Sequence, residues 1–300
     1  MDNITKETYC GYVAIIGRPN VGKSSLLNKI LGQKISITAR KPQTTRHKIL
    51  GIKTEKNIQA IYVDTPGFHV GGKRKLNKYM MRAIRSALAD VDIIIFVVEG
   101  LLWRKDDELI LENIIKASCP VILAINKVDK IKDKDKLLPH MKNLNQKFNF
   151  DANIPLSAKT GVNIFELEQI VAELLPINPF YFAEEQITDK SERFLVAEII
   201  REKLTRLLGQ ELPHELTVEI EKFEAKEKII NISAVIYVER PGQKAIIIGK
   251  KGEKLKEIGS KARIDIECLL NKKVFLQLWV KVKRGWSEDE QALKSLGYVD

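Results

Sequence analysis

The chain has 300 residues, of which 44% are hydrophobic and 30% are charged, and its mean hydropathy is −0.16. This balance excludes a wholly disordered or fibrous protein, and the longest strongly apolar stretch, 93–98, is too short for a transmembrane helix. Fifty Lys and Arg against 39 Asp and Glu give a formal charge of +11, which favours an anionic partner such as nucleic acid or a membrane surface. The length predicts two domains.

The cysteines and the N-terminal residues predict a cytoplasmic protein. Cys10, Cys119 and Cys268 are widely spaced and form neither a disulfide framework nor a CxxC metal pair. The first seven residues are polar and acidic and do not resemble a signal peptide. Both observations favour a reducing compartment.

Residues 1–178 alternate apolar runs of strand length with helical patterns. The expected strands are 12–16, 58–63, 91–98 and 121–125, and the expected helices are 23–31, 76–89, 106–116 and 164–175. Nearly continuous apolar runs indicate strands that are covered on both faces, as in a parallel sheet. We therefore expect a doubly wound α/β domain over residues 1–179.

The second half of the chain has a different order of elements. Pro176 and Pro179 end the first domain, and the second is expected to cover 180–300, with 180–189 as a linker. Its expected elements are a helix at 191–208 capped by Ser191, strands at 216–223 and 228–238, a helix–turn–helix around 249–252, a strand at 273–282 and a short helix within 287–300. The order α-β-β-α-α-β predicts a small α+β domain.

Residues 17–24, GRPNVGKS, match the pattern G-x-x-x-x-G-K-[ST] between an expected strand and an expected helix, which is the context of a phosphate-binding loop. Glycines such as Gly22 let backbone N–H groups turn toward phosphate oxygens. We expect Lys23 to reach the β- and γ-phosphates, Ser24 to supply a hydroxyl to Mg²⁺, and Ser25 to contact the α-phosphate.

Two further motifs follow strands in the order expected of a nucleotide site. Asp64 can hold Mg²⁺ through water, and Gly67 allows its N–H to meet a γ-phosphate. Asn126, Lys127 and Asp129 form an NKxD motif. The Asp129 carboxylate can accept two hydrogen bonds from guanine, whereas adenine has no such pair of donors and would leave the carboxylate unpaired.

A last motif, formed by Ser157, Ala158 and Lys159, offers a backbone N–H to the O6 atom of guanine. Each motif is common by chance, but all four occur in order and each follows a strand. Together they predict a domain that binds GTP or GDP with Mg²⁺ and hydrolyses GTP.

At this point the chain resembles the Era family of bacterial ribosome-assembly GTPases over its whole length. The resemblance is carried by GRPNVGKS, by KISITARKPQTTRH at 34–47 and by YVDTPG at 62–67. It implies slow GTP hydrolysis, with Lys23, Thr45 and Gly67 as catalytic residues, and binding near the 3′ end of 16S rRNA during assembly of the 30S subunit. It also implies a cytoplasmic protein with peripheral contact to the inner membrane, and we expect a monomer.

The resemblance also locates two switch segments. The first, 38–47, is polar and expected to be mobile, and it would contact Mg²⁺ through Thr45 or its neighbour Thr44. The second is 68–75. Phe68 stands where Ras-like enzymes have a glutamine that orients the attacking water. The motifs therefore do not identify the group that orients water here.

The chemistry that replaces this glutamine is only partly indicated by the sequence. The resemblance implies a K⁺ ion held by Asn20. Arg18, Arg40 and Arg46 are candidates for an arginine finger because of their proximity in sequence alone.

Gly249, Lys250, Lys251 and Gly252 match the GxxG loop of KH domains, which clamps a nucleic-acid backbone beside a groove for about four nucleotides. Lys254 adds charge, and residues 240–263 carry eight basic and two acidic side chains. The isoleucines at 246–248 are expected in the core and the groove wall. We therefore predict an α/β protein in which a P-loop doubly wound GTPase domain precedes a small α+β KH (type II) domain that binds single-stranded RNA.

Two other functions were weighed against this interpretation. A membrane-recruited signalling GTPase would use the basic stretch to bind lipid head groups or a protein, but lipid binding does not need the two glycines of the GxxG loop. A P-loop ATPase or kinase conflicts with the guanine-selective carboxylate of Asp129.

Overall fold

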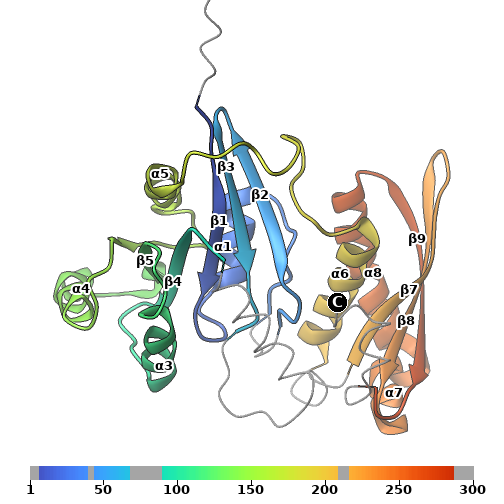
Figure 1. Cartoon of the computed structure of the whole chain (residues 1–300). Coiled ribbons are helices and arrows are strands. Elements are labelled where there is room, and N and C mark those ends of the chain that lie inside the picture. Colours follow the sequence, from blue (N-terminus) through green and yellow to red (C-terminus); the bar gives the residue numbers. More distant parts are fainter. Residues whose placement is uncertain (1–6, 40–43, 68–89, 209–215, 287–300) are drawn as a thin grey trace, which may run out of the picture. The chain divides into compact units, whose positions relative to one another are not determined.

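The computed structural model describes residues 7–39, 44–67, 90–208 and 216–286 (Figure 1). The chain divides into two compact units. The second unit contains the described residues from Lys190 onward together with residues 37–39 and Thr44, and the others belong to the first. The second switch with Phe68, the expected helix at 76–89, Arg40 and the expected helix within 287–300 lie outside the described residues.

The first unit is built on a sheet that has six strands among the described residues, in the order β2-β3-β1-β4-β5-β6. The strands are β1 (Tyr9–Ile16), β2 (Ile49–Glu55), β3 (Ile58–Asp64), β4 (Ile93–Glu99), β5 (Val121–Asn126) and β6 (Ala152–Pro155). All neighbouring pairs are parallel except β2 and β3, which are antiparallel from the pair Ile49–Asp64 to the pair Glu55–Ile58. The four strands that the sequence predicts, β1, β3, β4 and β5, therefore pair in parallel as expected, and the antiparallel edge strand β2 was not predicted.

Helices cover the central strands of this sheet. The described helices are α1 (Lys23–Leu31), α3 (Lys105–Ile114), α4 (Leu137–Asn145) and α5 (Ile164–Leu174). Apolar residues of α3 and α4 form one core with Ile94, Phe96 and Val98 of β4, while α1 contacts β1, β2, β3 and α5. The alternate β4 residues Ile93, Ile95 and Val97 are also fully buried. Both faces of β4 are thus covered, as the continuous apolar run predicts.

The expected linker, 180–189, belongs to the first unit rather than to the second. The N–H of Ile52 donates to the carbonyl of Ile187 at 2.8 Å, and the N–H of Leu50 donates to the Asp189 carboxylate at 3.1 Å. These bonds satisfy N–H groups of β2 at the edge of the sheet. Residues 180–189 therefore cover the β2 edge of the sheet.

The second unit confirms the predicted order α-β-β-α-α-β. Its elements are α6 (Glu192–Leu207), β7 (Leu216–Ala225), β8 (Ile229–Val238), α7 (Pro241–Ile248), α8 (Glu253–Leu270) and β9 (Lys273–Val282). Ser191 caps α6, because its hydroxyl accepts the N–H of Phe194 at 3.3 Å. The strands lie in the order β7-β8-β9, and β8 is antiparallel to β7 and parallel to β9.

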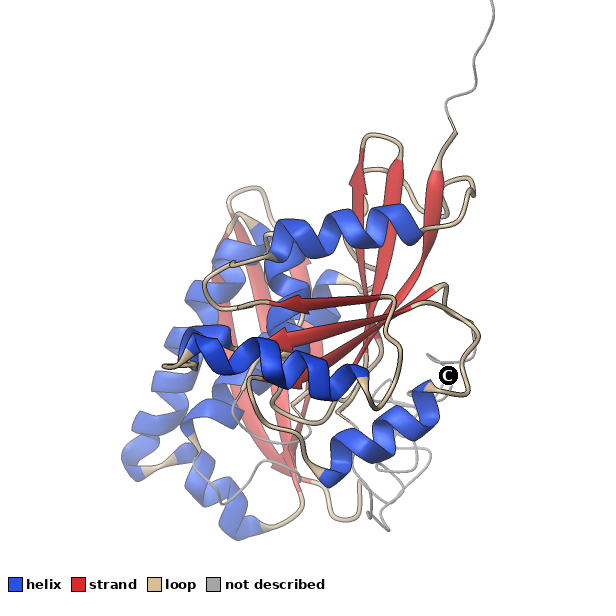
Figure 2. Ribbon diagram, turned by 90° about the vertical axis from the view of Figure 1, so that its left-hand side faces the viewer, coloured by secondary structure: helices blue, strands red, loops and turns tan. Residues whose placement is uncertain are grey.

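The core of the second unit lies between this sheet and its helices. One buried cluster contains Ile200 of α6 and Ile266 of α8 together with Ile232 and Val274 of the strands. Figure 2 distinguishes the helices and strands of the chain by colour. Trp279 of β9 is 58% exposed, because it alternates along the strand with the inward residues Leu278 and Val280. No helix in the described part of the chain is both long and apolar enough to cross a membrane.

Candidate functional site

The phosphate loop joins β1 to α1, and its two glycines lie too close to neighbouring atoms to carry a side chain. A Cβ on Gly17 would lie 2.4 Å from the carbonyl oxygen of Val97, and one on Gly22 would lie 2.2 Å from Nδ2 of Asn126. Gly22 also has a φ of 108° at the N-terminus of α1. The sequence signature G-x-x-x-x-G therefore reflects both conformation and close approach.

Lys23, the first residue of α1, is buried, and its Nζ donates to the carbonyl oxygens of Gly17 and Arg18 at 2.9 and 3.2 Å. Burial lowers the pKa of Lys23 to about 8, although the nearby Asp64 carboxylate acts in the opposite direction. A group held in this way gains from an additional anion, because the anion favours its charged form.

Oxygen atoms converge beside Lys23. The Ser24 hydroxyl donates to Oδ2 of Asp64 at 2.7 Å and lies 2.8 Å from the hydroxyl of Thr45. The buried Ser36 hydroxyl also donates to Oδ2, at 2.7 Å. Oδ1 of Asp64 is buried and has no hydrogen-bond partner among the described residues, and burial raises the pKa of this carboxyl. A carboxylate and hydroxyls in this arrangement fit Mg²⁺, which prefers oxygen ligands.

The two threonines that the sequence left open lie in different surroundings. Thr45 is buried with its hydroxyl beside Ser24, whereas Thr44 belongs to the second unit, where its carbonyl accepts a hydrogen bond from Arg201. In the same unit, the N–H and hydroxyl of Thr38 donate to Glu202, each at 3.2 Å. The first switch is thus divided between the units, and its residues 45–47 are buried rather than solvent-exposed.

Gly67 follows β3 and lies against the phosphate loop. A Cβ at this position would lie 2.9 Å from Cα of Pro19, so a larger residue would push the two segments apart. The structure therefore places the third predicted catalytic residue beside the same loop as Lys23.

The NKxD motif contacts the other side of the phosphate loop through two side chains. Nδ2 of Asn126 donates to the carbonyl of Val21 at 2.8 Å, and its Oδ1 accepts the N–H groups of Lys127 and Ala158 at 2.7 and 3.0 Å. Nζ of Lys127 donates to the carbonyl of Asn20 at 2.6 Å. The phosphate loop, the NKxD motif and the motif at 157–159 therefore meet at Asn126.

Asp129, the predicted base-reading carboxylate, is exposed, and its Oδ1 accepts the hydroxyl of Ser157 at 2.7 Å. This bond orients the carboxylate through one of its two oxygens. Lys159 is also exposed, and Ser25 is half-buried in the first turn of α1.

Three residues that no sequence motif indicated take part in this site. Glu99 ends β4 and pairs with Lys127, Asp107 pairs with Arg18, and Ser36 donates to Asp64. Only Glu99 had a usable indication in the sequence, because it directly follows a predicted parallel strand, where the carboxyl ends of strands form ligand sites.

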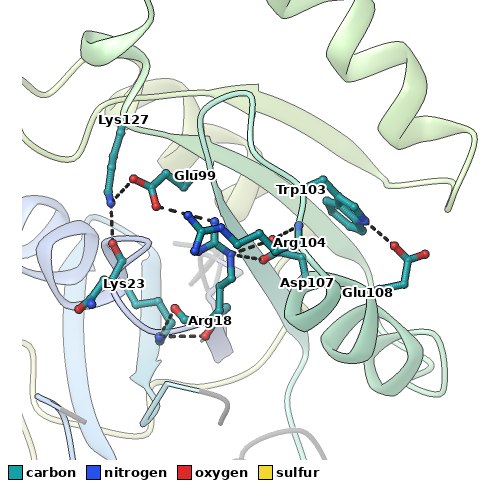
Figure 3. Close-up of polar contacts among 10 residues, drawn as sticks. Arg18, Lys23, Glu99, Trp103, Arg104, Asp107, Glu108 and Lys127 are labelled. Carbon is teal, nitrogen blue, oxygen red and sulfur yellow. Dashed lines mark hydrogen bonds and ion pairs between the residues drawn. The ribbon is translucent and has the colours of Figure 1, made fainter. Parts of the chain in front are cut away.

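Arg18 is not arranged as an arginine finger. Its side chain is buried and its Nε donates to both carboxylate oxygens of Asp107, at 3.0 and 2.8 Å (Figure 3). The guanidinium is thereby held against α3. Of the other two candidates, Arg46 is fully buried and Arg40 lies outside the described residues.

In the second unit, the GxxG loop lies between α7 and α8. Gly249 has φ 71° and ψ −177°, and a Cβ there would lie 2.7 Å from Cβ of Lys254. Gly252 has φ 80° and precedes α8, while Lys250 and Lys251 are exposed. The loop thus presents two cations next to a helix N-terminus, which is a favourable place for a phosphate.

A groove of about 370 Å³ lies next to this loop. Its lining residues come from the loop, α8 and β9, and they are Gly252, Leu255, Lys256, Gly259, Ser260, Arg263, Leu276 and Leu278. The apolar wall is therefore formed by three leucines and not by residues 246–248, of which Ile247 is fully buried in the core. Of the predicted contact residues, only Gly252 lines the groove itself.

Comparison with known proteins agrees with both halves of this description. A family model described as "50S ribosome-binding GTPase" matches residues 12–127, and one described as "KH domain" matches residues 211–287. GTPase Era of Pseudomonas aeruginosa is 56% identical over 299 residues, which cover 100% of this chain and 98% of that protein. GTPase Era of Actinobacillus pleuropneumoniae is 58% identical, with 99% and 98% covered.

The chain belongs to the GTPase Era family. Two solved structures of the family have nearly the same fold. One is Era in complex with MgGDPNP and nucleotides 1506–1542 of 16S ribosomal RNA, which is 40% identical, with a TM-score of 0.93 over 98% of this chain and 100% of that one. The other is a variant of Aquifex aeolicus Era bound to GDP·AlF4⁻, which is 39% identical, with a TM-score of 0.94 and the same coverage.

Membership of the Era family makes this chain a GTP hydrolase. It confirms the predicted fold class, with a P-loop GTPase domain followed by a KH domain. It also excludes the ATPase or kinase interpretation.

Proposed function

We propose that the chain is a GTP-controlled RNA-binding protein that acts on the 3′ end of 16S rRNA during assembly of the 30S subunit. The observation that carries the proposal is the presence, in one chain, of a guanine-nucleotide site and a basic GxxG groove. Era with MgGDPNP and a 16S rRNA segment bound matches both units of this chain together. This likeness supports the same pair of ligands here.

In the nucleotide site, each residue has a role that follows from its surroundings. Lys23 and the N–H groups of the phosphate loop would bind the β- and γ-phosphates, and Gly67 would bring its N–H to the γ-phosphate. Ser24, Thr45 and Asp64 would hold Mg²⁺, which neutralises charge on the phosphates when bound.

The base-recognition side of the site would select guanine. Asp129 would bind guanine through its carboxylate, and Lys127 and Ala158 support the site from the side of the base. K⁺ held by Asn20 is proposed as the group that compensates for the missing glutamine, because two of the three arginine candidates are placed otherwise: Arg18 is bonded to Asp107 and Arg46 is buried.

In the RNA site, Lys250 and Lys251 would bind backbone phosphates while bases enter the groove. Leucine walls suit the flat faces of bases, and Lys256 and Arg263 at the groove favour an anionic strand. The groove is lined from one helix and one edge strand, which suits a single strand better than a duplex.

The cellular setting is proposed on the same grounds. The three cysteines are free, which fits the cytoplasm. A monomer and peripheral contact with the inner membrane remain proposals, and a membrane-recruited GTPase that binds lipid or protein is the alternative.

Two measurements test the nucleotide half of the proposal. The purified protein should bind GDP in the presence of Mg²⁺ and should not bind ADP. Asp129→Asn should lose at least about a hundredfold in affinity for GDP and gain affinity for xanthosine diphosphate, because the amide reverses one hydrogen bond. Equal binding of ADP and GDP by the wild type would contradict guanine selection.

Crosslinking of the GTP-bound protein in cells, followed by sequencing of the attached RNA, tests the other half. Reads should gather at the 3′ end of 16S rRNA. Binding to anionic phosphatidylglycerol vesicles that is not displaced by a short single-stranded RNA, with no enriched RNA, would favour the lipid alternative.

A further inference from the structure

Four charged side chains form a connected network behind the phosphate loop (Figure 3). Arg18 of the loop is bonded to Asp107, which is fully buried at the N-terminus of α3 and also accepts the N–H of Arg104 at 2.9 Å. Lys127 of the NKxD motif donates to Oε1 of Glu99 at 2.7 Å. Nη2 of Arg18 lies 3.7 Å from the other oxygen of Glu99.

Glu99 is the member of this network that joins the two halves of the nucleotide site. Its carboxylate lies between a cation of the phosphate loop and the cation of the guanine motif. Lys127 makes two bonds with the same Nζ atom, one to Glu99 and one to the carbonyl of Asn20 in the phosphate loop. The position of this Nζ atom is therefore set by Glu99 on one side and by the loop on the other.

The charges of the network require Glu99. The side chains of Arg18 and Lys127 are 6% and 21% exposed, and Asp107 is committed to Arg18 through both of its oxygens. Among the described residues, Glu99 is the anion paired with Nζ of Lys127, and Nη2 of Arg18 is buried without a hydrogen bond and lies 3.7 Å from Glu99. Loss of the Glu99 charge would therefore leave both cations with less compensation. Partial burial would raise the pKa of Glu99, but Lys127 and Arg18 hold this pKa below its ordinary value, so the carboxylate is charged.

We propose that Glu99 is a positioning residue for guanine-nucleotide binding, which holds Lys127 against the carbonyl of Asn20 and thereby couples the base-reading motif to the phosphate loop. Arg18, braced by Asp107, is the second support of the same loop. The inference rests on guanine-nucleotide binding by this site. It assigns a role to a residue outside all four nucleotide motifs.

Glu99→Gln is the sharpest variant, because glutamine keeps the shape and one acceptor oxygen but removes the charge. The dissociation constant for GDP with Mg²⁺ should rise about tenfold, and that for GTP by the same factor, because Lys127 does not distinguish the two nucleotides. The kcat at saturating GTP should stay within about twofold, so the loss falls on binding alone.

The matched control is Glu108→Gln on α3. Glu108 accepts hydrogen bonds from Trp103 and Lys147 close to the network but is not bonded to Arg18 or Lys127 among the contacts of the described residues (Figure 3). This variant should bind GDP as the wild type does. An equal loss in both variants would show a general effect of charge and would overturn the proposal.

A double-mutant cycle tests whether Glu99 acts through Lys127. Lys127→Met should weaken GDP binding, and adding Glu99→Gln to it should cause a further loss well below tenfold, because Lys127 is already absent and only the 3.7 Å contact with Arg18 remains. The same tenfold loss in both backgrounds, or no loss from Glu99→Gln in the wild type, would overturn the proposal. If Glu99→Gln does not fold, Glu99→Asp replaces it. This variant keeps the charge, so its affinity for GDP should fall by less than tenfold. A larger fall would contradict the role of that charge.

Failure of guanine binding itself gives a different result. In that case the wild type would not prefer GDP to ADP, and the double-mutant cycle would have no wild-type GDP affinity against which to compare the variants. The two failures are therefore distinguishable.

Discussion

The phosphate loop and the GxxG loop use the same local device in different surroundings. Each places a glycine with positive φ directly before a helix, Gly22 before α1 and Gly252 before α8. A Cβ on Gly22 would lie 2.2 Å from Asn126, whereas a Cβ on Gly252 would meet no atom of the described residues within 4 Å. The first loop is enclosed by the side chains that fix its shape, and the second is open for a long and flexible ligand.

The largest difference between the two loops is expected in GDP affinity when a single glycine of each loop is replaced by alanine. Gly22→Ala should reduce GDP affinity by more than about a thousandfold, because the clash with Asn126 displaces the loop. Gly252→Ala should leave GDP binding unchanged and cost about 1 kcal/mol of stability from backbone strain. Titration calorimetry and thermal unfolding measure both effects. Similar losses of GDP binding in the two variants would remove the contrast.

A reversal of charge at the open loop should be the next largest effect. Lys250→Asp combined with Lys251→Asp should weaken binding of a single-stranded RNA from the 3′ end of 16S rRNA by about a hundredfold, since two phosphate contacts become repulsive. Its GDP affinity should equal that of the wild type. Fluorescence anisotropy of labelled RNA measures the loss.

The control for this pair is Lys116→Asp with Lys142→Asp, which makes the same change of net charge at exposed positions of the first unit. It should keep most of the RNA affinity. If it loses as much as the loop variant, the binding depends on overall charge and not on the GxxG loop.

The enclosed loop should also be sensitive to a residue that touches no phosphate. Ser36→Ala removes a 2.7 Å hydrogen bond to Asp64 and should raise the Mg²⁺ concentration needed for half-maximal GDP binding about tenfold. Binding of a fluorescent GDP analogue during a Mg²⁺ titration measures this. Ser260→Ala, in the groove of the second unit, should leave the titration unchanged, and a shift in that variant would argue against a local cause.

The smallest expected effect is a pH dependence at Glu99. Because the folded pKa of Glu99 lies below its ordinary value of 4.5, its stabilising contribution is complete above that value and is lost as the pH falls through the folded pKa. The wild type should exceed Glu99→Gln by less than about 1 kcal/mol in free energy of unfolding at neutral pH, since the pair is partly exposed. Urea unfolding without nucleotide measures the difference, which should disappear in acid. A difference independent of pH would mean that the charge contributes nothing.

The sequence predicts the elements whose own pattern is strong. The buried strands β1, β3, β4 and β5 are continuous apolar runs, and β9 alternates over its whole length, so all five were expected. The edge strand β2 was missed because Gly51 and Lys53 interrupt its apolar pattern. Two further elements were not predicted because their patterns are weak. The short strand β6 has one buried residue, Ile154, and α4 has Pro139 in its first turn and an exposed Leu138.

The same limit applies to the site. Lys23, Asp64 and Asp129 stand in motifs whose spacing carries the chemistry, so they could be found without a structure. Glu99 and Arg18 are 81 positions apart in the chain and meet only because β4 lies next to β1 in the sheet. Such pairs form only in the folded chain, and the spacing of residues along one sequence does not show which distant residues will meet.

The amide of Asn126 ties together the phosphate loop, its own motif and the motif at 157–159 through three hydrogen bonds. These bonds join protein atoms alone and hold the three segments in place, and ordering of this kind lowers the entropy cost of binding. A ligand that enters therefore meets a preorganised receptor, and one side-chain substitution at Asn126 would disperse all three segments at once.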